Sequence, residues 1–197
     1  FGLGLSAGLG MAMADRIKGL DSYTYVVMGD GEIEEGCIWE AAMSASKFGA
    51  DHLIGILDNN GVQLDGTLEE IMPMGDIGAK WKAFGWNVIP CDGHDVEDFC
   101  RAVEEAKKTK GCPSLILAAT VKGKGVSFME EKNTWHGKAS MIMNTHKQSR
   151  IRRCQIMGEN IAIRDAYGAA LKELGEQNEK IVGLEADVAS STKSGIF

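Results

Sequence analysis

The chain has 197 residues, with 28 Asp and Glu against 21 Lys and Arg, and a formal net charge of −7. This length can hold the core of one domain or slightly more, and the acidic balance argues against nucleic acid as the main partner. No apolar run is long enough to span a membrane, and five Cys without a C-x-x-C spacing disfavour a disulfide framework or a zinc site, so we expect a reduced, cytoplasmic protein.

Helical and extended patterns alternate along the chain. A helix is expected over residues 6–18, where Ser6 can cap the start and Gly19 can form the end. The later expected helices cover 34–48, 76–84 and 95–109, and the expected strands cover 23–28, 53–57, 86–90 and 114–120. Strands this apolar are usually buried on both faces. The pattern predicts an α/β fold, a doubly wound parallel sheet with helices on both faces.

A second unit is expected near the end of the chain. A helical pattern over 161–175 precedes a strand pattern over 180–187, and one helix with one strand cannot bury a core. We therefore expect three parts. They are a domain over 1–139 that is truncated at its N-terminus, an atypical basic join over 140–157, and the incomplete start of another domain over 158–197.

Two polar turns follow neighbouring strands, Gly29-Asp30-Gly31 and Asn59-Asn60-Gly61-Val62. In doubly wound sheets, ligands bind outside the carboxyl ends of the strands. Glycine lets a backbone approach a phosphate, and Asp30, Asn60 and the carbonyl of Val62 offer the oxygen ligands that a hard divalent cation takes. Gly, Asn and Asp also dominate ordinary turns, so either motif alone could be structural. Their joint position behind two buried strands favours a site for a cation and a diphosphate.

Together the two motifs resemble the thiamine diphosphate signature, and the residues around them resemble transketolase. The matching segments are 29–42, 65–66, 92–95, 122–130 and 135–138. The resemblance runs from residue 2 to about 139 and resumes at about 161, where it is similar to the start of the family's pyrimidine-binding domain. It implies transfer of a two-carbon ketol unit from a ketose phosphate to an aldose phosphate, as in the pentose phosphate pathway, with thiamine diphosphate and Mg²⁺ or Ca²⁺ as cofactors.

The resemblance also implies residue roles. The implied metal ligands are Asp30, Asn60 and Val62. The implied cofactor contacts are Gly29, Asp30, Gly31, Asn60, His136 and Asp187. The implied catalytic residues are His136 and Glu35, and the implied substrate contacts are His136, Arg164 and Ser190.

Several of these residues have structural alternatives. His136 could be a surface-loop histidine, and Glu35 could favour a helix start through its charge alone. We favour a structural interpretation for His94, in which a turn is followed by a helix cap at Asp95. The tryptophans Trp39 and Trp81 are expected in the core or an interface.

The chain also departs from the family pattern. Leu3 replaces a Gln, Phe1 replaces a Leu against the cofactor ring, and the family's catalytic Glu and N-terminal histidines have no counterpart here, so autonomous catalysis is not expected. Residues 140–156 carry four positive charges and break the resemblance. One hypothesis is a reading-frame slip that joins the two adjacent genes of a split transketolase; an insertion or a genuine basic linker are the alternatives.

Three other functions stay open at this point. A deoxyxylulose-phosphate synthase-like enzyme would share the cofactor and two of the motifs. A dinucleotide-binding module would use the Gly2-x-Gly4-x-x-x-Gly8 pattern, although no strand precedes it. An orphan fragment would be non-catalytic. The transketolase interpretation implies sugar phosphates as partners and a homodimer or an assembly of split subunits, without nucleic acid or membrane.

Overall fold

The structure is a computed structural model that describes residues 1–137, 170 and 172–177. Contacts divide the chain into two compact units, one over Gly2–Arg152 and one over Arg153–Phe197 together with Phe1. Residues 170 and 172–177 are helical; they overlap the end of the helix predicted over 161–175 and extend two residues past it. The predicted strand over 180–187 lies outside the described residues.

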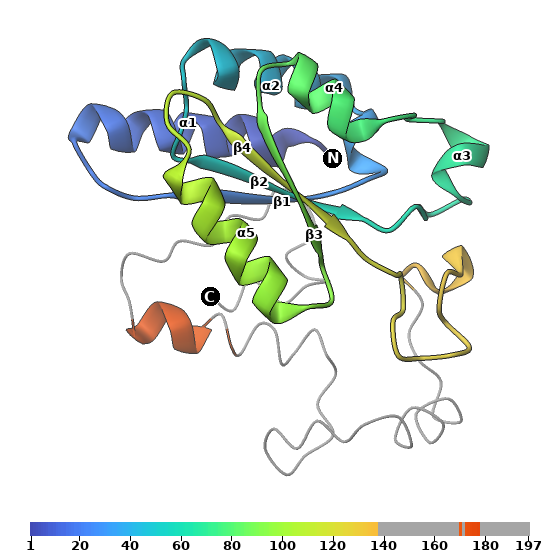
Figure 1. The fold of residues 1–197 in the computed structure, drawn as a ribbon. Helices are drawn as coiled ribbons and strands as arrows, with labels where there is room; N and C mark the ends of the chain where they lie inside the picture. Colours follow the sequence, from blue (N-terminus) through green and yellow to red (C-terminus); the bar gives the residue numbers. More distant parts are fainter. Residues whose placement is uncertain (138–169, 171, 178–197) are drawn as a thin grey trace. The chain divides into compact units, whose positions relative to one another are not determined.

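The first unit alternates helices and strands as the sequence predicts (Figure 1). The elements are α1 (Leu3–Lys18), β1 (Thr24–Gly29), η1 (Glu32–Glu34), α2 (Gly36–Lys47), β2 (Leu53–Asn59), α3 (Leu68–Ile71), α4 (Ile77–Ala83), β3 (Asn87–Asp92), α5 (Val96–Lys108), β4 (Ser114–Ala119) and η2 (Asn133–Trp135). The strands form one sheet in the order β1-β2-β4-β3, and all three pairings are parallel. The predicted doubly wound α/β fold is confirmed.

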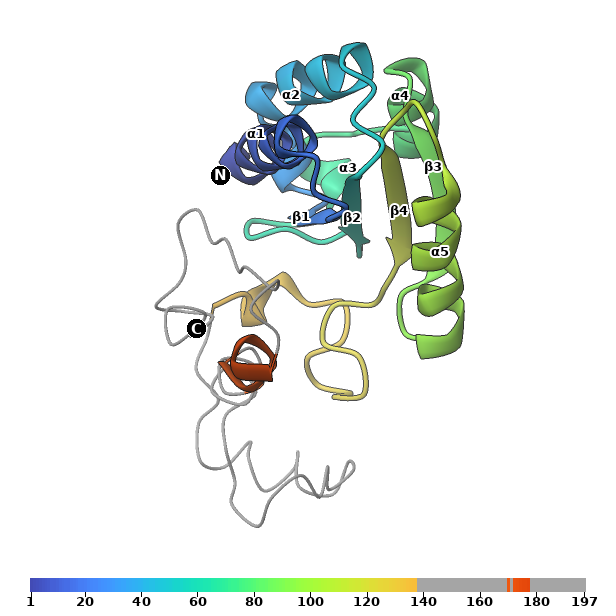
Figure 2. The ribbon, with the colours of Figure 1, turned by 90° about the vertical axis from the view of Figure 1, so that its left-hand side faces the viewer.

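Helices pack on both faces of the sheet (Figure 2). One face buries a cluster in which α1, α2 and α4 meet alternate residues of the strands, among them Met28, Leu57 and Leu115. The other face buries a smaller cluster between α5 and the residues that point the opposite way, such as Ile54, Ile89 and Ile116. The alternation follows from the two-residue period of a strand. Among the described helices, none combines the length and apolar character needed to cross a membrane.

The expectation that every strand is buried on both faces is wrong for β1. Tyr25 is 42% exposed and Val27 is 69% exposed, whereas Met28 on the opposite face is buried. The reason is position, because β1 is an edge strand and α5 contacts β3 and β4. An apolar run therefore predicted the strand correctly but not the covering of its second face.

Two predicted helix starts also differ from the structure. Helix α1 begins at Leu3 rather than at residue 6, and Gly2, not Ser6, is the N-cap residue. Gly2 has φ 79° and donates its N–H to Glu32 Oε1 at 2.9 Å, a partner 30 residues away. Helix α2 begins at Gly36, two residues later than predicted, because Glu32–Glu34 form a 3₁₀ turn.

The glycines of α1 let the helix pack closely on β1. A Cβ placed on Gly8 would lie 2.4 Å from Val26 Cγ2, and one on Gly4 would lie 3.6 Å from Val26 Cγ1. Both glycines therefore lie where α1 contacts β1, and at Gly8 the contact leaves no room for a Cβ. The glycine pattern that superficially fits a dinucleotide site thus has a packing explanation.

A matched pair of substitutions tests this packing. We expect Gly8→Ala to lower the free energy of unfolding by about 1–3 kcal/mol, because the stiff Val26 side chain must shift. Gly10→Ala in the same helix meets no atom within 4 Å, so it should raise stability by about 0.5–1 kcal/mol through helix propensity. Urea unfolding followed by circular dichroism measures both. Stability changes of the same sign would contradict the packing argument.

Candidate functional site

The two polar turns predicted to form a site do meet in the structure. Gly29 at the end of β1 pairs in register with Asp58 of β2, so the two strands end at the same edge of the sheet. The N–H of Asp30 donates to the Asp58 carbonyl at 3.3 Å. One Asp30 carboxylate oxygen accepts the N–H of Gly61 in the second turn. The carboxylate of the first motif thus lies directly against the backbone of the second.

Asp30 is a buried carboxylate held by backbone N–H groups. The residue is only 2% exposed, and its second carboxylate oxygen accepts the Gly31 N–H at 2.9 Å. Burial raises the pKa of this carboxyl, while the N–H groups of Gly61, Gly31 and Asn60 oppose the rise and the charge of Asp58 adds to it. Three N–H donors influence the pKa of Asp30, and among the residues that the structure describes no cationic side chain does. A buried anion in this setting is a natural ligand for a cation.

The second turn is shaped by Asn60 and Gly61. Asn60 Oδ1 accepts the N–H of Val62 at 3.0 Å, which is a local Asx-type turn. Gly61 has φ 74°, a backbone region that favours glycine, and its carbonyl accepts the N–H of Leu68 at 3.0 Å. Val62 is buried and forms an antiparallel bridge with Thr67. The turn is therefore a small ordered hairpin beside Asp30.

Two supporting residues were not identified from the sequence. Glu32 accepts the N–H of Gly2 at 2.9 Å and the N–H of Gly29 at 3.2 Å, so one carboxylate joins the start of α1 to the end of β1. Gln63 donates to Glu34 Oε1 at 3.0 Å and lies 3.0 Å from where a Cβ on Gly31 would be. Gln63 thus packs against the glycine of the first motif. The contacts of Glu32 with Gly2 and of Gln63 with Glu34 have no local sequence signal, since the partners are about thirty residues apart.

His136 lies in the segment after β4, at the end of η2. The residue is exposed, and partial desolvation followed by the positive charge of Lys122 lowers its pKa. Asn133 Nδ2 in η2 donates to the Leu64 carbonyl at 3.3 Å, which joins this segment to the hairpin that begins at Asn60. Trp135 Nε1 donates to the Phe128 carbonyl at 3.1 Å within the same segment. The segment that carries His136 is thus attached to the candidate site through the hairpin rather than through Asp30.

Of the remaining predicted site residues, Glu35 is the one in the described part of the chain. It is exposed at the N-cap position of α2 and makes no side-chain cap hydrogen bond, so any contribution to the helix start comes from its charge. Arg164, Asp187 and Ser190 lie outside the described residues. Within the ranges that the structure describes, no group of three or more His, Cys, Asp and Glu is placed to hold a metal ion. A metal at this edge would need the mixed carboxylate, amide and carbonyl ligands predicted above.

Two cavities open at the carboxyl ends of the strands, and Asn59 and Leu117 line both. The smaller, about 330 Å³, reaches residues 74–78 before and within α4. The larger, about 710 Å³, reaches the β3–α5 turn and the chain that leaves β4, including His94 and Lys124. Their position agrees with the rule that doubly wound sheets bind ligands at this edge.

The fold and the two joined turns define a doubly wound α/β domain with its polar turns gathered at the carboxyl edge of a parallel sheet. A known family, described as the transketolase thiamine diphosphate-binding domain, matches residues 1–183. The chain belongs to this family. The match confirms the resemblance on which the predictions of cofactor class and enzyme class depend.

Individual relatives agree with the family. The chain is 48% identical over 135 residues to the 6-deoxy-6-sulfo-D-fructose transketolase subunit SqwG of Clostridium sp. strain MSTE9, and the match covers 68% of this chain and 49% of the relative. It is 45% identical over 135 residues to an apulose-4-phosphate transketolase subunit of Phocaeicola vulgatus, covering 68% and 48%. The chain therefore spans about half the length of these relatives.

A solved structure supports the same assignment. Transketolase from Leishmania mexicana superposes with a TM-score of 0.64 at 32% identity, over 68% of this chain and 22% of that one. The shared part therefore corresponds to a limited portion of a much longer enzyme.

Proposed function

We propose that the chain supplies the diphosphate-binding half of a thiamine diphosphate-dependent transketolase, which transfers a two-carbon ketol unit from a ketose phosphate to an aldose phosphate. The observation that carries the proposal is the buried Asp30 carboxylate against the Asn60–Gly61 backbone, at the edge where both strands end. Membership of the family supports the cofactor class.

The residues at this edge fit a divalent cation with a diphosphate. Asp30, Asn60 and the Val62 carbonyl would hold Mg²⁺ or Ca²⁺, since these are the oxygen donors that hard cations prefer. A cation would also offset the burial of the Asp30 charge. Gly29 and Gly31 would let the backbone approach the diphosphate. When bound, thiamine diphosphate supplies the electron sink for breaking a carbon–carbon bond beside a carbonyl.

Other residues are proposed to complete the site. His136 would contact diphosphate and substrate, and its lowered pKa keeps the imidazole neutral and able to accept a proton at neutral pH. Glu35 would link this site to a second one across a subunit interface. Arg164 and Ser190 would grip the sugar phosphate, and Asp187 would lie near the cofactor.

The assembly is proposed from the relatives. Two relatives are named as subunits of transketolases, so we favour a partner chain that supplies the other half of the site, in a cytoplasmic heteromer; a homodimer is the alternative. The domain limits of 1–139, 140–157 and 158–197 stay proposals. A deoxyxylulose-phosphate synthase-like activity is not favoured, because the three related proteins described above are all named as transketolases.

The proposal is tested by titrating the full chain with thiamine diphosphate in a calorimeter, with and without Mg²⁺. We expect saturable binding only when both are present, because the buried carboxylate needs the cation to accept a diphosphate. EDTA should reverse the binding. Equal heats with and without Mg²⁺ would contradict the proposed site, and absence of heat in both conditions would favour the orphan-fragment alternative.

A further inference from the structure

The turn between β3 and α5 is held in one position by its own residues. Asp92 Oδ1 accepts the N–H of His94 at 2.8 Å, and Gly93 donates its N–H to the Ala119 carbonyl of β4 at 2.8 Å. A Cβ on Gly93 would lie 2.4 Å from Thr120 Cγ2, so no larger residue fits against the end of β4. The turn therefore packs directly against the end of β4.

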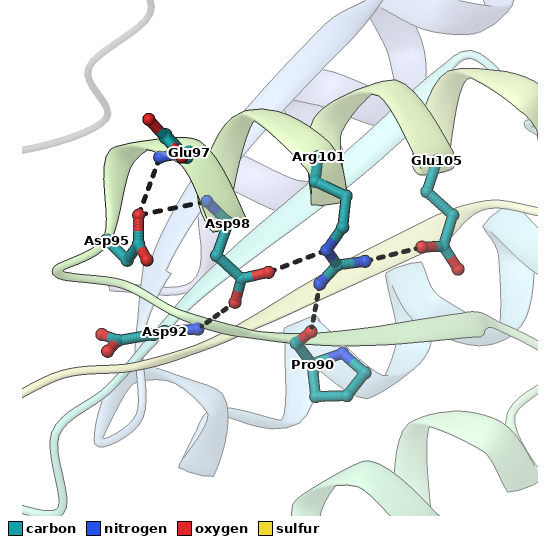
Figure 3. Close-up of polar contacts among 7 residues, drawn as sticks. All are labelled: Pro90, Asp92, Asp95, Glu97, Asp98, Arg101 and Glu105. Carbon is teal, nitrogen blue, oxygen red and sulfur yellow. Dashed lines mark hydrogen bonds and ion pairs between the residues drawn. The ribbon is translucent and has the colours of Figure 1, made fainter.

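Helix α5 fixes this turn from the other side (Figure 3). Asp95 caps the helix by accepting the N–H groups of Glu97 at 2.9 Å and Asp98 at 3.3 Å. Asp98 accepts the N–H of Asp92 at 2.8 Å and pairs with Arg101 at 2.7 Å, and both contacts lower the pKa of Asp98. The network continues to Pro90 and Glu105, which Arg101 contacts at 3.2 Å and 2.8 Å. The end of β3 and the start of α5 form one rigid support for His94.

His94 uses this support to hold a distant backbone group. Its Nε2 atom accepts the N–H of Val121 at 2.7 Å, across 27 residues of sequence. A backbone N–H can only donate, so Nε2 is the unprotonated nitrogen of the ring. Val121 is the second residue after β4, where the chain leaves the sheet toward His136.

The segment that starts at Val121 is connected through to His136. Just before it, Thr120 donates its N–H to the Asn59 carbonyl at 3.2 Å and its hydroxyl to Asp58, so β2 holds this point from the opposite side. Just after it, the Lys122 carbonyl accepts the N–H of Glu131 at 2.9 Å, which closes a loop. Displacing Val121 would therefore displace the loop and the η2 turn that ends at His136.

We propose that His94 is a positioning residue for the cofactor site: its Nε2 hydrogen bond to the Val121 N–H fixes the origin of the segment that carries His136. The hydrogen bond itself is given by the structure. Its consequence for cofactor binding rests on the proposed function.

The bond depends on the protonation state of the ring, because an imidazolium has no acceptor nitrogen. The charged groups around His94 are Asp92 and Asp95 in its own turn, Asp98 and Arg101 on α5, and Lys124 in the segment after β4, which lines the same cavity.

Amide hydrogen exchange at Val121, measured by NMR on the full ¹⁵N-labelled chain, tests the bond directly. We expect His94→Phe, which keeps a ring but removes the acceptor, to raise exchange at Val121 about threefold to tenfold. His94→Gln places an amide oxygen acceptor at similar reach and should retain the protection of the Val121 N–H. Glu97→Gln in the first turn of α5 is the control and should behave as wild type. Thermal unfolding checks that each variant is folded.

The same variants are titrated with thiamine diphosphate and Mg²⁺. We expect affinity to fall at least about threefold in His94→Phe and to be restored in His94→Gln. Unchanged Val121 exchange in His94→Phe overturns the tether. Faster exchange with unchanged affinity overturns the positioning role. A wild type that binds no cofactor rejects the proposed function, whereas the exchange data still decide whether the tether exists.

Discussion

Replacing Asp30 by Asn is expected to abolish metal-dependent thiamine diphosphate binding while leaving the fold intact. Asn is nearly isosteric and retains one oxygen acceptor, but it removes the charge that attracts the cation. A unit charge pair at about 4 Å in an effective dielectric near 20 contributes about 4 kcal/mol before desolvation. A loss of affinity of at least about 100-fold, or about 2.7 kcal/mol, is therefore expected in calorimetric titration.

Thermal unfolding gives an independent readout for Asp30. Because a ligand that binds only the folded state stabilises it, cofactor with Mg²⁺ at about 100 times the dissociation constant should add about 2.7 kcal/mol to the wild type and almost nothing to Asp30→Asn. Asp21→Asn is the control, since it removes the same charge from a side chain that is 94% exposed before β1, outside the candidate site. Equal binding by wild type and Asp30→Asn would remove Asp30 from the site.

The pKa of Asp30 sets the expected pH dependence. A raised pKa means that the folded protein without metal binds this proton more tightly than the unfolded chain. The metal-free fold therefore gains stability as pH falls from the raised pKa of Asp30 to the ordinary Asp value, and Mg²⁺ must displace the proton in this range. As the pH is lowered, cofactor affinity should therefore begin to weaken at a pH higher than the ordinary Asp pKa of about 3.9.

Trp81→Ala should be among the most destabilising single changes in this chain. The Trp81 side chain is fully buried, and its ring lies 4.7 Å from that of Trp86 and 5.3 Å from that of Trp39, between α4, α2 and β3. Trp39 in turn donates to the Ile33 carbonyl at 2.8 Å, in the 3₁₀ turn after Asp30. Truncating a buried Trp costs about 3–5 kcal/mol, a large part of a typical stability of about 5–15 kcal/mol.

Trp81→Phe is the matched control for that change. Within the described part of the chain, Trp81 Nε1 is buried without a hydrogen-bond partner, so Phe loses ring volume but no hydrogen bond. We expect it to cost no more than about half as much as Ala in urea unfolding. Equal losses for the two variants would show that the packed ring volume is not what stabilises this cluster.

Much of the fold could be predicted because local patterns determine it. The apolar runs of β2 and β4 and the Asp95 cap of α5 each act within a few residues, and all were placed correctly. The meeting of Asp30 with the Asn60 turn was predictable too, since parallel strands end at a common edge.

The features that the sequence did not predict have a common physical origin: they depend on contacts between residues far apart in the sequence. Gly2 caps α1 because Glu32 accepts its N–H. Val27 is exposed because α5, on the same face of the sheet, packs over β3 and β4 and not over the edge strand β1. The Val121 N–H finds its acceptor on His94, and Gln63 packs on Gly31, from separate elements. Local spacing carries no record of these pairings, so only the assembled structure shows them.

The carboxylate of Glu32 has a mechanical consequence, because its two oxygens bind the amide that caps α1 and the last amide of β1. Opening the first turn of the helix would break the hydrogen bond from Gly2 and leave the Glu32 side chain less restrained, which would weaken its hydrogen bond with Gly29. Fraying at the amino end of α1 would therefore spread to the peptide just before Asp30. Local opening at these two places should therefore be cooperative, and the amides of Gly2 and Gly29 should lose protection together.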